Sequence, residues 1–215
     1  MKIKFIGTGS GKTSLKRFHS SFLLSDNNKN ILFDCGDGIS RALLLQDVDL
    51  LSIDSIIISH LHPDHYAGLP LLISQMKMNK RTSEIKIFIH KSSELFIKSI
   101  VTQSYLFEAK LGFKVSYFPF NHDEEFLIEN IFHCISKQNS HLDKYLKFDV
   151  GNNLSLMSSS FLIRTNNASL LYTGDLGNKI DLLLFDSTQF EYLISEIMHI
   201  SFDDLLPIIN SDSIK

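Results

Sequence analysis

Cysteine is scarce in this sequence, and long apolar runs are missing from it. The two cysteines, Cys35 and Cys134, stand far apart among the 215 residues, which argues against a disulfide framework and favours reduced thiols in a core. No apolar run approaches the roughly 20 residues that a membrane-spanning helix needs. Residues 1–5 lead into a glycine-containing segment instead of the apolar core of a signal peptide. We therefore expect a soluble, cytoplasmic protein with no membrane partner.

A strong excess of one charge is also lacking. The chain has 21 Lys and Arg against 24 Asp and Glu, a formal net charge of −3, and no long basic block. This balance gives no electrostatic argument for bulk binding to nucleic acid, although it leaves room for a local basic patch. The length and a hydrophobic content of 44% fit one globular domain, residues 1–215, with a core of two layers or more.

What the chain does contain is a dense group of ligand-type side chains directly after the apolar run 56–58. His60 and His62 stand two apart, so they project to the same side of an extended backbone and can share one ion. The chain then turns at a proline and offers Asp64 and His65 to a neighbouring position. Imidazole and carboxylate suit Zn²⁺, and Mn²⁺ or Fe²⁺ accept the same ligands. We predict a two-metal site here; the alternative is a histidine-rich surface loop.

The glycine-containing segment 7–13 follows a predicted strand, as a nucleotide-binding loop would. However, the Walker A pattern needs a glycine where Ile6 stands, and the dinucleotide pattern needs one where Lys12 stands. Residues 20–24 are strand-like, whereas a phosphate-binding loop leads into a helix. We therefore expect this segment to let the backbone pass close to the metal site.

Three further candidates follow predicted strands. Asp34 either accepts a hydrogen bond from a ligand histidine or caps the helix predicted near residues 39–46. Asp175 follows the strand predicted over 168–172, where its two oxygens can bridge two cations; an ordinary turn aspartate is the alternative. His141 stands in a polar stretch after a strand. Further helices are predicted over 66–78, 92–107 and 190–197, and further strands over 84–89, 111–120, 125–136, 157–164 and 181–186.

The pattern His-x-His-x-Asp-His at residues 60–65 resembles the signature of the metallo-β-lactamase superfamily, a group of binuclear metal hydrolases. Together with residues 5–9, 32–38 and 172–175, it resembles the ribonuclease Z-like branch, which contains tRNA 3′-processing endonucleases and small phosphodiesterases. The resemblance implies an α/β fold class, the four-layer αβ/βα sandwich of two sheets flanked by helices.

The resemblance also implies roles for individual residues. The implied metal ligands are His60, His62 and His141 on one ion, Asp64 and His65 on the other, and Asp175 between them. Asp64 would also orient an attacking hydroxide. The segment beginning at His199 resembles a His-Ser-Thr-like motif, which implies that His199 assists departure of the leaving oxygen, with Asp186 in the place of its acidic partner.

Two features depart from the pattern of that branch. No glycine-rich and basic excursion corresponds to the arm that grips tRNA, which argues against folded tRNA as a substrate. In addition, residues 211–215 stand about where a final strand and its histidine ligand would begin. We therefore expect the fold to lack that strand and the second metal to be weak or absent. Water, His199 or another subunit would then fill the position, which leaves a homodimer open.

The leading hypothesis is a metal-dependent hydrolase, a phosphodiesterase or nuclease-like enzyme that uses a metal-activated hydroxide. Its substrate would be a small phosphodiester or a nucleic acid. An alternative enzyme would hydrolyse an ester, lactone or thioester on the same binuclear site. A third hypothesis, motivated by the missing last ligand, is a weakly catalytic protein that binds a metal or a partner.

Overall fold

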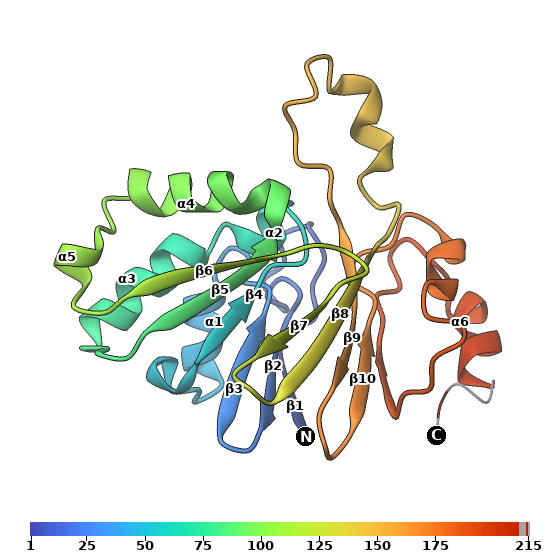
Figure 1. Cartoon of the computed structure of the whole chain (residues 1–215), viewed down its shortest axis with the longest axis horizontal. Helices are drawn as coiled ribbons and strands as arrows, with labels where there is room; N and C mark the ends of the chain where they lie inside the picture. Colours follow the sequence, from blue (N-terminus) through green and yellow to red (C-terminus); the bar gives the residue numbers. More distant parts are fainter. Residues whose placement is uncertain (211–213, 215) are drawn as a thin grey trace. The chain divides into compact units, whose positions relative to one another are not determined.

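The computed structural model describes residues 1–210 and 214. The chain divides into two compact units, Met1–Phe120 and Asn121–Lys215, and each has a sheet of its own (Figure 1). That residues 1–215 fold as one domain stays a prediction. No helix in the described part of the chain has both the length and the apolar character needed to cross a membrane.

The first unit is built on a six-stranded sheet in the order β1-β2-β3-β4-β5-β6. Its strands are β1 Lys2–Gly7, β2 Ser21–Asp26, β3 Lys29–Phe33, β4 Ser55–Ile57, β5 Ile85–His90 and β6 Val115–Phe120. β1, β2 and β3 pair antiparallel, and β3 to β6 run parallel. Because parallel strands end at one edge of a sheet, the segments that follow β3 and β4 meet there, at the edge where open α/β sheets bind ligands.

Helices pack along this sheet. They are α1 Ile39–Leu45, α2 Pro63–Tyr66, α3 Leu69–Met78, α4 Glu94–Gln103 and α5 Glu108–Leu111, with the short 3-10 helices η1 Leu50–Ser52 and η2 Lys91–Ser93. α3 contacts both α1 and α4, and α4 contacts β6 (Figure 1). α3 buries Leu69, Leu72, Ile73 and Met76, the helical spacing that places them on one face toward the core.

The second unit has a five-stranded sheet in the order β11-β10-β9-β8-β7. Its elements are β7 Glu125–Ile128, β8 Phe132–Gln138, η3 Asp143–Phe148, β9 Ser159–Arg164, β10 Ser169–Tyr172, η4 Lys179–Leu183, β11 Tyr192–Ile194 and α6 Phe202–Ile209. Neighbouring strands are antiparallel, except that β10 and β11 run parallel. Leu162, Leu171, Phe185 and Phe190 form one buried cluster of this unit.

A long connection between β8 and β9, residues 139–158, leaves the sheet and includes η3 (Figure 1). Leu146, Phe148 and Val150 on it are exposed. The carboxylate of Asp149 accepts hydrogen bonds from the backbone N–H groups that follow it, which closes the turn at the tip. This connection is neither glycine-rich nor basic, so it does not contradict the prediction that the chain lacks a glycine-rich and basic excursion.

Three predicted elements of the second unit are also wrong. Residues 125–136 form a hairpin instead of one strand, because Glu129 and Asn130 turn the chain with φ angles of 51° and 57°. The predicted strand 181–186 overlaps the 3-10 helix η4, which starts at a capping box. The predicted helix 190–197 contains strand β11.

Pairing with β10 explains the change in the last of these segments. Glu191, just before β11, binds the start of β10. Its backbone N–H donates to the Ser169 carbonyl, 3.1 Å, and its carboxylate accepts from the Ser169 N–H, 2.6 Å. A tertiary ladder thus overrides a short helical pattern, as is common for strands. The prediction that the fold lacks a final strand near residues 211–215 concerns positions that lie mostly outside the described residues.

Candidate metal centre

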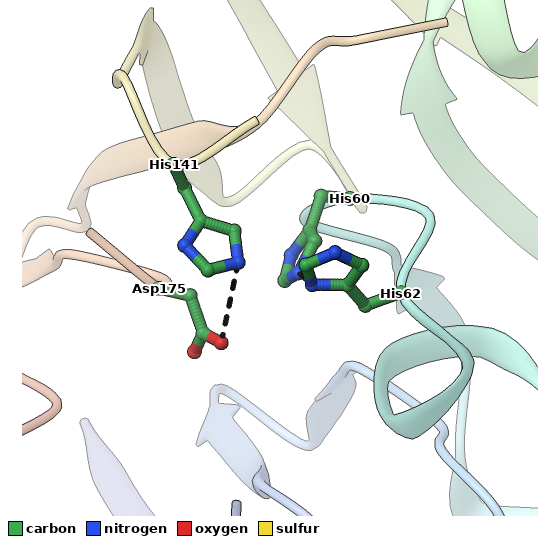
Figure 2. Close-up of side chains that lie close together, drawn as sticks. All are labelled: His60, His62, His141 and Asp175. Atoms are coloured by element: carbon green, nitrogen blue, oxygen red, sulfur yellow. Dashed lines mark hydrogen bonds and ion pairs between the residues drawn. The ribbon is translucent and has the colours of Figure 1, made fainter. Parts of the chain in front are cut away.

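The histidine-rich segment begins just after β4, at the edge of the sheet where the parallel strands end. His62 is extended (φ −75°, ψ 141°) and precedes α2. His60 Nε2 lies 3.0 Å from His62 Nδ1, and the two rings meet edge to face (Figure 2). As their spacing predicted, both imidazoles turn to the same side of the chain. His60 is buried and His62 is partly exposed, so the pair stands at the border of the core.

Asp34 holds the other histidine of the segment. Its Oδ2 lies 2.8 Å from His65 Nδ1 and accepts a hydrogen bond from Ser59 Oγ–H, 2.9 Å, while its Oδ1 accepts one from the Ser59 N–H, 2.8 Å. Helix α1 has no side-chain cap, so the prediction of a histidine-orienting acceptor is confirmed over that of a helix cap. Because His65 Nδ1 faces Asp34, its Nε2 faces Asp64, 3.6 Å from Asp64 Oδ2.

The loop after β3 packs directly on α2. Cys35 N–H donates to the His65 carbonyl, 2.8 Å, and a Cβ on Gly36 would stand 1.8 Å from the carbonyl oxygen of Asp64. Only glycine fits at such a distance. A Cβ on Gly11 would stand 3.2 Å from Asp64 Oδ2, which confirms that the glycine-containing segment passes close to this carboxylate.

In the second unit, His141 follows β8 and Asp175 follows β10. His141 Nε2 lies 3.7 Å from Asp175 Oδ2, the contact drawn as a dashed line in Figure 2. His141 Nδ1 lies 3.2 Å from the carbonyl oxygen of Leu176, so Nδ1 carries the proton and donates to it. This bond fixes the ring with Nε2 toward the carboxylate. His141 is buried, and the Asp175 side chain is 19% exposed.

His199 lies against this pair in the second unit. Its ring meets the His141 ring edge to face, with centroids 4.8 Å apart. Its Nδ1 lies 3.1 Å from Oε1 of Glu196, which also accepts from the Leu176 N–H at 3.2 Å. The prediction of Asp186 as its partner was therefore wrong. Sequence reasoning missed Glu196 because the segment was predicted to be a helix, although its place three residues before His199 was a usable signal.

Side chains that could hold a metal thus occur in both units: His60, His62, Asp64 and His65 in the first, and His141 and Asp175 in the second. They offer imidazole nitrogen and carboxylate oxygen, the donors preferred by borderline divalent ions. His65 and His141 already direct Nδ1 to a carboxylate or a carbonyl, the arrangement that orients histidine ligands in metal sites. The donor set therefore fits a divalent metal.

Comparison with known proteins agrees with this chemistry. The model of the family described as anti-Pycsar protein Apyc1 matches residues 1–206. Ribonuclease Z of Methanococcus maripaludis strain C5 is 35% identical over 105 residues, which cover 49% of this chain and 33% of that protein. The chain spans about a third of the length of the curated relatives that it matches.

Solved structures show the same fold. The metallo-β-lactamase fold protein YhfI from Bacillus subtilis matches with a TM-score of 0.69 and 18% identity, over 90% of this chain and 69% of that one. The short form of human tRNase Z matches with a TM-score of 0.68 and 20% identity, over 90% and 76%. The α/β metallo-β-lactamase fold and the ribonuclease Z-like resemblance are thereby confirmed. The chain belongs to the family described as anti-Pycsar protein Apyc1, and it has the metallo-β-lactamase fold.

Proposed function

We propose that this protein is a metal-dependent hydrolase of phosphodiester bonds. One observation carries the proposal: imidazoles and carboxylates gather where strands end, and His65 and His141 are already oriented through Nδ1. Relatives of the chain are named ribonuclease Z and tRNase Z, names that refer to cleavage of a phosphodiester in RNA. The same type of bond is therefore the proposed target here.

The proposed ligands are His60, His62 and His141 for one ion, Asp64 and His65 for a second, with Asp175 shared. Zn²⁺ suits these donors, and Mn²⁺ or Fe²⁺ accept them too. When bound, such ions lower the pKa of water from about 15.7 toward 7 and neutralise charge on phosphoryl oxygens.

Side chains of the protein orient the attacking water and protonate the leaving oxygen. Asp64 accepts a hydrogen bond from the attacking water and so orients it toward phosphorus. His199, in its protonated form, donates the proton on Nε2 to the leaving oxygen. Its Nδ1–H meanwhile keeps its hydrogen bond to the Glu196 carboxylate. Glu196 acts through His199, because its carboxylate fixes the direction of the ring.

The proposed substrate is a small phosphodiester instead of folded tRNA. The connection 139–158 projects from the second unit, but Lys144 and Lys147 on it are balanced by Asp143 and Asp149. Binding a polyanion depends on many cation contacts to phosphate, which this segment does not offer. A panel that contains a small diester, a single-stranded oligonucleotide and a tRNA precursor tests this choice, and turnover of the precursor alone would contradict it.

The experiment for the reaction is hydrolysis of bis(p-nitrophenyl) phosphate by the zinc-loaded protein. We expect Asp64→Ala to lose about 100-fold or more in rate, because it removes both a proposed ligand and the group that orients water. Glu108→Ala, which removes an exposed carboxylate of the same unit, is the matched control and should keep the wild-type rate. Equal rates for Asp64→Ala and wild type would sink the proposal.

A further inference from the structure

The loops that carry His141 and Asp175 are joined by the carboxylate of Asp181. Its Oδ2 accepts hydrogen bonds from the Gly177 N–H and from Ser140 Oγ, both 2.8 Å, and its Oδ1 accepts from the Ser140 N–H, 3.1 Å. Ser140 immediately precedes His141, and Gly177 lies two residues after Asp175. One carboxylate therefore holds both loops of the second unit.

The two loops are in direct contact at this point. A Cβ on Gly177 would stand 2.3 Å from Ser140 Oγ and 2.5 Å from the Ser140 carbonyl oxygen, so any larger residue would push the loops apart. Asn178 Nδ2 also donates to Ser140 Oγ, 2.8 Å. Asp181 thus lies in a hydrogen-bonded network that joins the loops of His141 and Asp175.

Helix capping alone does not account for these contacts. Asp181 does form a capping box with Asn178 at the start of η4. Asp204 forms the same kind of box with Ser201 at the start of α6, and these hydrogen bonds join residues only three positions apart. Asp181 instead also reaches Ser140, a residue 41 positions earlier in the chain.

We propose that Asp181 is a positioning residue of the metal centre, which sets the separation of His141 and Asp175 before an ion binds. The inference rests on the proposed function, since it takes these two side chains as ligands of one ion. Hydrogen bonds to a charged carboxylate are about twice as strong as neutral ones. Loss of a partner outside the ligand shell typically weakens metal affinity by about 10- to 100-fold.

The test compares Asp181→Asn with wild type after removal of metal. Zn²⁺ affinity is measured by titration calorimetry, and the ligand geometry by the visible absorption spectrum of bound Co²⁺. We expect zinc affinity to fall about 10- to 100-fold and the cobalt spectrum to change. Asp204→Asn is the matched control, because it loses a capping carboxylate of the same unit and should keep both the affinity and the spectrum.

Ser140→Ala keeps the inference testable if Asp181→Asn does not fold, since it removes only the hydroxyl that contacts Asp181 and Asn178. A smaller loss of zinc affinity in the same direction is expected. If Asp181→Asn folds and keeps the wild-type zinc affinity and cobalt spectrum, the inference is overturned and the proposed function stands. If Asp181→Asn does not fold, the same result in Ser140→Ala overturns the inference. A wild-type chain that binds no Zn²⁺ would overturn the proposed function, and this inference with it.

Discussion

Asp34 occupies a demanding position for a charged residue. Its side chain is fully buried, and its backbone has the left-handed φ of 58°, a conformation that aspartate tolerates better than most residues. A buried carboxylate without partners would be costly. Here Ser59 and His65 supply donors, so the carboxylate is satisfied and the imidazole of His65 is fixed at the same time.

Replacing Asp34 should therefore act on metal affinity. In Asp34→Asn, one carboxylate oxygen becomes an NH₂ group that meets donors of Ser59 or His65, so His65 loses its orientation. We expect Zn²⁺ to bind about 10- to 100-fold more weakly by calorimetry. Asp54→Asn is the control, because Asp54 accepts hydrogen bonds from Lys29 and Asn30 away from the histidines. The same loss in both variants would contradict this role.

The two thiols are predicted to be chemically inert. Burial raises the pKa of Cys35 well above its usual value, and the charge of Asp34 adds to the shift; burial likewise raises the pKa of Cys134. The reactive thiolate is therefore nearly absent at neutral pH. We expect almost no reaction with iodoacetamide in the folded protein and two modified cysteines per chain in denaturant, measured by mass spectrometry. Rapid labelling of the folded chain would refute this.

Among the elements, the contact between the loop after β3 and helix α2 matters most for the first unit. Gly36 faces the Asp64 carbonyl, the Cys35 N–H donates to the His65 carbonyl, and the Gly68 N–H donates to the Cys35 carbonyl, 2.9 Å. The backbone of the histidine segment is thus held by the strand beside it. The proposed ligands on this segment are therefore placed by β3 as well as by β4.

Gly36→Ala should disrupt this contact. The new methyl group would overlap the Asp64 carbonyl oxygen, so α2 must move and carry Asp64 and His65 with it. We expect a loss of stability of about 1–3 kcal/mol, the usual cost of overpacking, together with weaker zinc binding. Gly112→Ala is a comparison for stability alone, because nothing lies within 4 Å of its Cβ position; its own φ of 82° adds strain without touching the site. Unchanged zinc affinity in Gly36→Ala would contradict the prediction.

At the scale of the whole molecule, both units carry proposed ligands, so stability should depend on metal. A ligand that binds only the native state stabilises it by about 4 kcal/mol at a concentration of about 1,000 times Kd. We expect a chelator to lower the melting temperature by several degrees and added Zn²⁺ to restore it, in a calorimetric scan.

Elemental analysis supplies the stoichiometry for the same sample. Two zinc ions per chain would support both proposed sites, and one would support the prediction that the second site is weak. An identical melting temperature for the metal-free protein with and without added Zn²⁺ would argue against a native metal centre.

Sequence alone determined the chemistry of the proposed ligands and most strands of the first unit. His60, His62, Asp64 and His65 are adjacent in the chain, so their donors and spacing are local properties that a linear pattern contains. The α/β fold followed from the same motif and its resemblance. Strand β4 also has a local cause, since its apolar run is buried on both faces.

Only the tertiary structure decided the partners of the distant residues. Glu196 instead of Asp186 holds His199, because β11 pairs with β10 where a helix was predicted. Asp181 joins Ser140 to Gly177 across two connections, although its own segment was predicted to be a strand. Most of these contacts depend on how strands and loops pack in the folded chain, and the local periodicity of the sequence does not predict such contacts.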